Sequence, residues 1–183
     1  METSRIGFLG LGNMGGPMAA NLVKGGHTVL GYDPVEAAQE AARAAGVQVV
    51  GAPSDAVTDV DAVITMPPNG ALVLSTYDDV LAAAAPGTLF VDSSTIAVDD
   101  AREAAERASK AGHRFLDAPV SGGVVGAEAG TLTFMVGGSA DDLEAARPVL
   151  EPMSGRIVHC GETGNGQVAK LCNNLILAIS MVG

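Results

Sequence analysis

The stretch Ile6-Gly7-Phe8-Leu9-Gly10-Leu11-Gly12-Asn13-Met14-Gly15 decides the fold of this chain. Its apolar start predicts a buried strand, and the glycines that follow have the spacing G-x-G-x-x-G. The first glycine permits a tight turn, the second lets a pyrophosphate approach the backbone, and the third lets a helix pack on the strand. The stretch therefore predicts the phosphate turn of a Rossmann domain. Its predicted cofactor-binding residues are Gly10, Leu11, Gly12, Asn13, Met14 and Gly15.

Short β-branched runs alternate with alanine-rich helical stretches along the chain. The predicted strands are residues 6–9, 28–32, 47–50, 62–65, 88–92 and 114–117, and the predicted helices are residues 14–24, 35–45, 69–77 and 98–111. This alternation predicts a doubly wound parallel sheet with helices on both faces. Further elements are a strand at 131–136, a helix at 139–150 with Ser139 as its N-cap, and a strand at 156–159. We therefore expect an α/β Rossmann domain with extra C-terminal strands over residues 1–162.

Asp33 stands at the end of the second predicted strand. Its distance from the glycine turn is that expected of the carboxylate that binds the adenosine ribose hydroxyls. Residues 34–36, which follow it, include no Arg or Lys to hold a 2′-phosphate. We therefore predict NAD rather than NADP as the cofactor, with Tyr32 and Asp33 in its site.

Two polar residues follow the fourth and fifth predicted strands. Asn69 and Thr95 both lie at the carboxyl edge, where doubly wound sheets bind ligands, and the Met-Pro-Pro stretch 66–68 forms a stiff bend there. Each residue alone could be an N-cap of the next helix and nothing more. Because the two share one edge of the sheet, we include both among the candidate cofactor-binding residues.

Lys170 differs from the other lysines of the chain. Lys24 and Lys110 lie at predicted helix C-termini, where the helix dipole favours a cation. Lys170 lies near the start of an apolar helix predicted from about residue 167 to the end, with Asn173 and Asn174 on its face. If that face is a solvent-exposed stripe, these residues need no function. If it is buried, the pKa of the lysine falls and the amine can accept a proton from an alcohol.

Residues 117–123, with the sequence Asp-Ala-Pro-Val-Ser-Gly-Gly, end another predicted strand. The hydroxyl of Ser121 and the N–H groups of Gly122 and Gly123 can form a small anion-binding nest that suits a carboxylate. A glycine-rich turn without a ligand is the alternative for residues 121–123.

The phosphate turn at residues 10–15 and Lys170 together indicate a hydride-transfer enzyme.

The charge of the chain argues against several kinds of partner. The net charge is −11 and the isoelectric point is near 4.4, so phosphate backbones and anionic lipids are repelled. The longest apolar stretch, residues 171–182, is too short to span a bilayer. Residues 1–5 lead directly into the first strand, and two cysteines make no disulfide framework. We expect a cytoplasmic protein without nucleic-acid, membrane or metal partners.

Taken together and in order, residues 6–15, 117–123 and 166–170 with Asn173 and Asn174 resemble the β-hydroxyacid dehydrogenases. The resemblance implies oxidation of a small 3-hydroxycarboxylate, 3-hydroxyisobutyrate, to methylmalonate semialdehyde in valine breakdown, with NAD as hydride acceptor. It implies that Lys170 is the catalytic lysine. The implied substrate-binding residues are Ser121, Gly122, Gly123 and Asn174, and we add Asn173 beside them as a candidate substrate-binding residue. The implied cofactor contacts are the glycine turn, Asp33, Met66, Pro67 and Thr95.

The same resemblance implies an all-helical second domain that closes the active site and forms much of a dimer. We expect residues 163–183 to be the start of the helix that connects to it, with the rest of that domain absent. We therefore expect this chain to bind NAD but to turn over poorly. We also expect the bare apolar helix over residues 171–182 to drive self-association into a dimer or tetramer, which a clean monomer at high concentration would contradict.

Other functions remain open at this point. Reductases of glyoxylate, succinic semialdehyde or tartronic semialdehyde use the same residues. The 6-phosphogluconate dehydrogenases are disfavoured, because their His-Asn pair is here Asn173-Asn174. A non-catalytic dinucleotide-binding module is the alternative from another class, although scaffold relatives that lose activity typically lose the lysine, which is present here.

Overall fold

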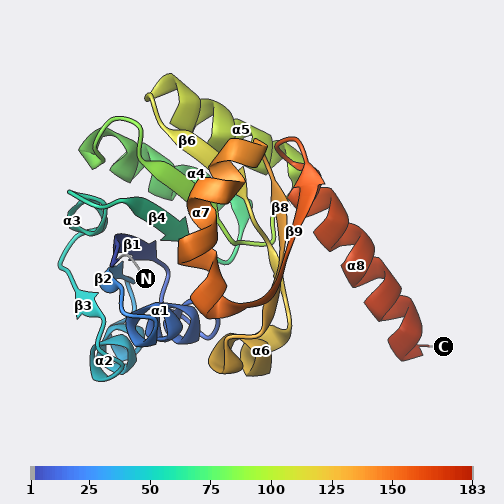
Figure 1. Cartoon of the computed structure of the whole chain (residues 1–183), viewed down its shortest axis with the longest axis horizontal. Helices are drawn as coiled ribbons and strands as arrows, with labels where there is room; N and C mark the ends of the chain where they lie inside the picture. The colour runs from blue at the N-terminus through green and yellow to red at the C-terminus, as the bar shows by residue number, and fades with distance from the viewer. Residues whose placement is uncertain (1–2, 183) are drawn as a thin grey trace.

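A mostly parallel sheet runs through the middle of the molecule, between two layers of helices (Figure 1). The computed structural model describes residues 3–182, and in this range nine strands form one sheet. The parallel half consists of β1 (Arg5–Leu9), β2 (Thr28–Tyr32), β3 (Gln48–Val49), β4 (Ala62–Thr65), β5 (Leu89–Asp92) and β6 (Arg114–Asp117). Its order, β3-β2-β1-β4-β5-β6, reverses direction between β1 and β4. This order confirms the predicted doubly wound Rossmann sheet.

Three further strands extend the sheet beyond β6. They are β7 (Val120–Ser121), β8 (Leu132–Gly137) and β9 (Ser154–Gly161). β8 runs antiparallel to β6 and β7, while β9 runs parallel to β8. The predicted extra strands are thus confirmed. β9 is longer than the predicted residues 156–159, and the two-residue β7 is too short to leave a periodic signal.

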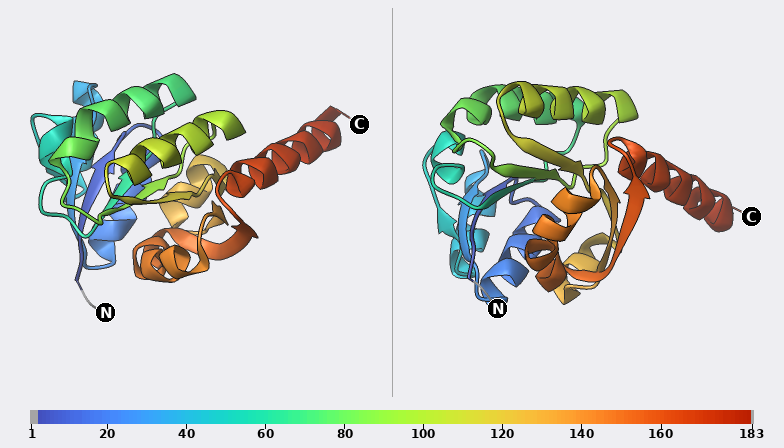
Figure 2. Two further views of the ribbon diagram at one scale, coloured as in Figure 1. Left: turned by 90° about the horizontal axis from the view of Figure 1, so that it is seen from above. Right: turned by 45° about the horizontal axis from the view of Figure 1, so that its top comes forward.

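Helices cover both faces of the sheet (Figure 2). One face carries α1 (Gly15–Lys24), α2 (Glu36–Ala44), α6 (Gly123–Ala129) and α7 (Ala140–Leu150), with the 3₁₀ turn η2 (Glu151–Met153). The other face carries α3 (Pro53–Ala56), α4 (Gly70–Val80) and α5 (Val98–Lys110), with the 3₁₀ turn η1 (Leu81–Ala83). Two apolar cores result, one on each side of the sheet, as expected for strands buried on both faces.

Side-chain caps mark the starts of α4 and α7, whereas α6 begins without one. The side chain of Ser139 accepts the Asp142 N–H at 3.0 Å, which confirms the predicted N-cap, and that of Asn69 accepts the Leu72 N–H at 3.0 Å, which is the alternative left open for that residue. The sequence of α6, GVVGAEA, has low helix propensity, and we did not predict a helix there. Tertiary contacts stabilise it: the side-chain amide of Asn21 in α1 donates to the Ala127 carbonyl at 2.6 Å.

The last helix, α8 (Asn165–Val182), projects away from the sheet (Figures 1 and 2). It begins two residues before the predicted start, and the predicted end at residue 183 lies outside the described residues. Gly166 and Gln167 are buried, whereas Leu175, Ile176 and Ile179 are each more than 60 % exposed. Full burial therefore reaches only the first turn of α8, and the face with Lys170, Asn173 and Asn174 is half-buried. No helix within residues 3–182 has the length and apolarity needed to cross a membrane.

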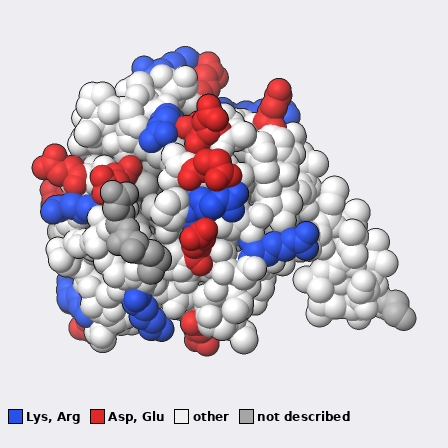
Figure 3. Space-filling model, viewed as in Figure 1, with Lys and Arg blue, Asp and Glu red and all other residues white. Residues whose placement is uncertain are grey.

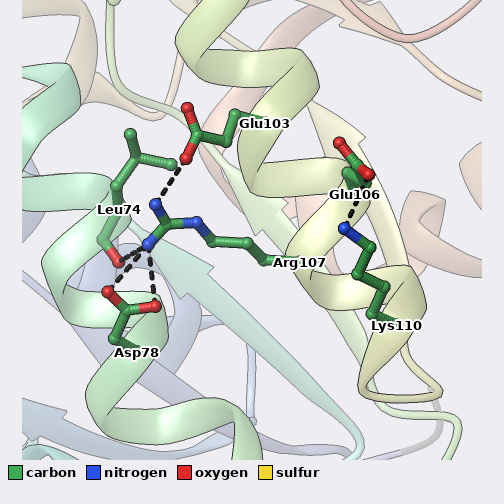
Figure 4. A network of polar contacts seen from close by, with 6 residues as sticks. All are labelled: Leu74, Asp78, Glu103, Glu106, Arg107 and Lys110. Carbon is green, nitrogen blue, oxygen red and sulfur yellow. Dashed lines mark hydrogen bonds and ion pairs between the residues drawn. The ribbon is translucent and has the colours of Figure 1, made fainter.

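Charged side chains of both signs are interspersed over the face shown in Figure 3, and the outer half of α8 is uncharged. One exposed network joins α5 to α4 (Figure 4). The guanidinium of Arg107 donates to both carboxylate oxygens of Asp78 at 2.7 Å and also pairs with Glu103. Exposed pairs of this kind contribute little to stability, so the apolar core on this face of the sheet determines how α4 and α5 pack.

We expect Gly15→Ala to destabilise the fold and Gly12→Ala to leave it intact. A Cβ at Gly15 would lie 1.8 Å from the Gly10 carbonyl oxygen, whereas a Cβ at Gly12 would meet nothing within 4 Å. Overpacking that forces backbone to move costs about 3 kcal/mol, and the free energy of unfolding in urea should fall by that order in Gly15→Ala alone. Equal losses in the two variants would contradict the packing role of the third glycine.

Candidate active site

An open cleft of about 1340 Å³ lies at the carboxyl ends of β1, β2 and β4, where the strand order reverses. Ligands bind at this point in doubly wound sheets. Most residues predicted to bind the cofactor line this cleft. They are Gly10, Leu11, Gly12, Asn13, Met14, Gly15, Tyr32, Asp33, Met66, Pro67 and Thr95.

The glycine turn forms one wall of the cleft. Gly10 has φ +96°, a conformation that favours glycine, and its N–H donates to the Tyr32 carbonyl at 2.9 Å. Gly12 is exposed and has open space where a side chain would stand, so a pyrophosphate can approach the backbone there. The N-terminus of α1 follows without a side-chain cap, and unpaired N–H groups at a helix start attract an anion. These features fit the phosphates of a dinucleotide.

Asp33 holds the glycine turn in shape as well as lining the cleft. Its Oδ2 accepts the Leu11 N–H at 2.7 Å, and its Oδ1 accepts the Val35 N–H at 2.8 Å. The side chain is buried, and each carboxylate oxygen keeps a second lone pair for a ribose hydroxyl. Sequence reasoning predicted the ribose contact. It missed the bond to Leu11, which only the pairing of β1 with β2 brings about.

Asn69 and Thr95, which the sequence treated alike, differ in the structure. Asn69 is exposed, caps α4 and is not among the residues that line the cleft. Thr95 does line the cleft, and it is not a cap, because α5 begins at Val98 after Ala97. The structure therefore brings Thr95 to the predicted cofactor site and uses the side-chain oxygen of Asn69 for a helix start.

Several cleft residues were not predicted, because they lie on helices whose orientation depends on packing. α1 contributes Lys24, α4 contributes Leu72 and Thr76, and α6 contributes Val124 and Glu128. The first turn of α4 had a usable signal, since it directly follows the predicted edge residue Asn69. The α6 residues had none, because that helix was not predicted.

Lys170 lies in the second turn of α8, half-buried. Burial lowers the pKa of its amine below the usual value. Within residues 3–182 the side chain has no acidic partner within ion-pair distance. A lysine in this state is suited to exchange a proton with a bound alcohol or carbonyl.

The Ser-Gly-Gly loop lies between α8 and the cleft. Asn173 of α8 donates from Nδ2 to the Ser121 Oγ at 3.4 Å, which joins the helix of Lys170 to this loop. Gly122 and Gly123 are exposed and have φ +136° and +61°, conformations that favour glycine, and their N–H groups lie on an exposed loop. Val124, the next residue, lines the cleft. Asn174 is half-buried on the same helix, one turn after Lys170.

Asp117 fixes the start of α8 at the end of β6. Its Oδ1 accepts the Gly164 N–H at 2.7 Å, and its Oδ2 accepts the Gln167 N–H at 3.0 Å. Burial raises the pKa of this carboxyl, while the two backbone bonds lower it. We predicted no role for Asp117, although it begins the motif at residues 117–123, because its hydrogen-bond partners are 47 and 50 residues away along the chain.

Asp92, opposite Asp117 on the neighbouring strand β5, is fully buried. Its Oδ1 accepts the Thr65 hydroxyl at 2.8 Å, and its Oδ2 has no hydrogen-bond partner in the described part of the chain. Burial raises the pKa of Asp92 from 3.8 to about 6, and the charge of Asp117 adds to this effect. The site edge therefore holds two neighbouring carboxyl groups that both favour the protonated form more than a free aspartate does.

We expect Asp92→Asn to stabilise the protein at pH 8 by roughly 2 kcal/mol and to change it little at pH 4. Because the pKa of Asp92 is about 6 in the folded state, against 3.8 when unperturbed, the folded state binds the proton more tightly, and stability is lost as pH rises through this range. Asparagine keeps the acceptor for Thr65 without the buried charge. Urea unfolding at both pH values tests this, with the exposed Asp79→Asn as control; an equal effect at both values would contradict it.

Comparisons with known proteins agree with this geometry. Residues 5–161 match the family model described as the NAD binding domain of 6-phosphogluconate dehydrogenase. The chain is 58 % identical over 177 residues to a probable 3-hydroxyisobutyrate dehydrogenase of Mycobacterium tuberculosis, covering 97 % of this chain and 60 % of that protein. It is 50 % identical to an NAD-dependent L-serine dehydrogenase of Pseudomonas aeruginosa, covering 98 % of this chain and 61 % of that protein.

A solved structure is similar over the same range. The Mycobacterium tuberculosis 3-hydroxyisobutyrate dehydrogenase with L-serine superposes with a TM-score of 0.97 at 57 % identity, covering 99 % of this chain and 62 % of that one. The chain thus spans about 60 % of the length of these relatives. The cofactor of this domain is NAD. The chain belongs to the family of the NAD-binding domain of 6-phosphogluconate dehydrogenase.

Proposed function

We propose that this chain forms the NAD-binding part of a 3-hydroxyacid dehydrogenase that oxidises 3-hydroxyisobutyrate to methylmalonate semialdehyde, a step of valine breakdown. The observation that carries the proposal is the position of Lys170, whose half-buried amine lies on a helix joined to the Ser-Gly-Gly loop beside the dinucleotide cleft. The similarity to 3-hydroxyisobutyrate dehydrogenases over 97 % of the chain supports it.

Lys170 exchanges the proton in the proposed reaction. Bound NAD supplies the hydride acceptor. The neutral amine of Lys170 takes the proton of the substrate hydroxyl, and burial, which lowers its pKa, enlarges the neutral fraction near neutral pH. In the reverse direction its ammonium form stabilises the developing alkoxide and returns the proton.

The Ser-Gly-Gly loop binds the substrate carboxylate in this proposal. The Ser121 hydroxyl and the N–H groups of Gly122 and Gly123 supply neutral donors, which suit an anion in a chain of net charge −11. Asn173 orients Ser121 through their 3.4 Å hydrogen bond, and Asn174 contacts the substrate. The carboxylate end and the hydroxyl end of a 3-hydroxy acid would thus be bound by two adjoining elements.

The same donors suit more than one small hydroxy acid. L-serine is a second candidate, because a relative with 50 % identity is named an NAD-dependent L-serine dehydrogenase. Serine, like 3-hydroxyisobutyrate, carries a carboxylate and a primary hydroxyl, so the same donors suit both acids. Reduction of another small semialdehyde, such as tartronic, succinic or glyoxylate, would use the same groups in reverse.

The expected low turnover, oligomeric state and location stay predictions. Because the chain spans about 60 % of its relatives, we propose that it binds NAD but completes the reaction poorly alone. The exposed apolar side chains of α8 favour the predicted dimer or tetramer. A cytoplasmic location also stays a prediction, since similar proteins of Drosophila melanogaster and Homo sapiens are named mitochondrial.

A non-catalytic dinucleotide-binding module remains the alternative function, and the presence of Lys170 disfavours it.

We expect Asp33→Ala to change the choice between NAD and NADP. Loss of the carboxylate removes the acceptor for the ribose hydroxyls of NAD and the repulsion of the 2′-phosphate of NADP. The dissociation constant of NADP divided by that of NAD should therefore fall at least about tenfold in calorimetric titrations. Loosening of the turn at Leu11 would weaken both cofactors alike. Equal weakening of NAD and NADP would therefore show that Asp33 shapes the turn without selecting the cofactor.

We expect Lys170→Met and Lys170→Arg to lower the rate of NADH formation by roughly 10²- to 10⁴-fold while NAD affinity stays within about threefold. The assay uses 3-hydroxyisobutyrate and L-serine with this chain, and with this chain fused to the part of the Mycobacterium tuberculosis relative that lies beyond the match. Activity should rise with pH as the lysine loses its proton. Lys110→Met, an exposed lysine of α5, is the matched control.

Two outcomes would contradict this proposal. Activity that survives both Lys170 substitutions would exclude the lysine as the proton acceptor. NAD binding by the fusion protein without turnover of either acid or of a semialdehyde would favour the non-catalytic module. Rapid turnover by the 183-residue chain alone would overturn the expectation that it is poorly active.

A further inference from the structure

The side chain of Gln167 joins the cofactor loop to the helix that carries Lys170. Gln167 lies in the first turn of α8 and is 0 % exposed. Its Nε2 donates to the Ser94 carbonyl at 2.7 Å, and its Oε1 accepts the Ile96 N–H at 3.2 Å. These two backbone groups flank Thr95, which lines the dinucleotide cleft. One amide group therefore holds both sides of a cofactor-site residue.

The chemistry of this position requires a neutral amide. A buried amide must find both a donor and an acceptor, and the backbone of Ser94 and Ile96 offers one of each. Leucine would leave both backbone groups unpaired. Ionised glutamate would place a negative charge against the Ser94 carbonyl and could no longer donate to it.

The first turn of α8 is also fixed to the sheet by its backbone. Asp117 accepts the N–H groups of Gly164 and Gln167, and a Cβ at Gly166 would lie 2.4 Å from the Met135 carbonyl oxygen. The helix start thus packs directly against the ends of β6 and β8. A displacement of the loop at residues 94–96 would strain the hydrogen bonds that seat this turn.

We propose that Gln167 is a positioning residue that couples occupation of the cleft at Thr95 to the placement of Lys170. The inference rests on the proposed function of the cleft and of Lys170. Lys170 follows Gln167 by three residues, so the seating of the first turn determines how deeply its amine is buried. Coupling between two sites is reciprocal, and a ligand that orders residues 94–96 therefore also orders the start of α8.

The first test needs no ligand and compares the wild-type chain with Gln167→Leu. Reductive methylation with ¹³C-formaldehyde labels Lys24, Lys110 and Lys170, and NMR follows the titration of each. We expect the pKa of Lys170 to move towards the ordinary lysine value in Gln167→Leu, with Lys24 and Lys110 unchanged. Gln48→Leu, at an exposed glutamine of β3, should change none of them. An unchanged Lys170 in folded Gln167→Leu would overturn the proposal and leave Gln167 a packing role only.

The second test measures amide hydrogen exchange with and without NAD. In the wild-type chain NAD should slow exchange at the glycine turn and, by about tenfold, at residues 165–170. In Gln167→Leu the slowing should persist at the glycine turn and be lost at residues 165–170. Equal slowing in both proteins would overturn the proposal. If NAD slows no amide in the wild-type chain, cofactor binding fails, and the lysine titration still decides the role of Gln167.

Gln167→Glu keeps the proposal testable if Gln167→Leu does not fold. A protonated carboxyl can donate to the Ser94 carbonyl and accept the Ile96 N–H, whereas the ionised form cannot donate. The neighbouring carboxyls of Asp92 and Asp117 favour the protonated form. The exchange rates of the amides at residues 165–170, relative to wild type, should fall by about tenfold as pH is lowered from 8 to 5, because the protonated carboxyl restores the donor to the Ser94 carbonyl that seats this turn. A ratio that does not change with pH would contradict the required donor.

Discussion

The carboxylate of Asp117 accepts two N–H groups at the start of α8, and the placement of the helix that carries Lys170 depends on this contact. A helix start leaves N–H groups without partners inside the helix, so a buried acceptor there both satisfies them and fixes where the helix leaves the sheet. Asp117 ends β6, the last of the parallel strands. Lys170 and Asn173 are therefore placed relative to the Rossmann sheet by a bond that neither of them makes.

The carboxyl ends of β5 and β6 hold two buried carboxyl groups whose ionised forms destabilise the folded state. Asp92 and Asp117 lie opposite each other on β5 and β6, and burial raises the pKa of both. The phosphate turn avoids this cost, because residues 10–15 offer backbone N–H groups and glycine geometry and carry no charged side chain. That choice explains how a chain of net charge −11 presents a site for a pyrophosphate.

Features that are local in sequence could be predicted from it. The spacing of Gly10, Gly12 and Gly15 defines the turn because backbone conformation over six residues decides it. The cap at Ser139 was predicted for the same reason, since a cap reaches only three residues along the chain. Lys170 stood out because charge is rare on an apolar helix. Helix α6 was missed because its stability comes from α1, about a hundred residues earlier in the chain.

The sequence by itself thus determined the doubly wound fold, the glycine turn, the acidic residue Asp33 and the candidate lysine, each through short spacings that backbone geometry converts into structure. Only the tertiary structure decided that Asp117 seats α8, that Gln167 bonds to both sides of Thr95, and that Asn69 is a cap outside the cleft. The Gln167 contacts join residues 71 and 73 positions apart. No local pattern encodes them, because such contacts form only once the sheet brings the ends of β5 and β6 together.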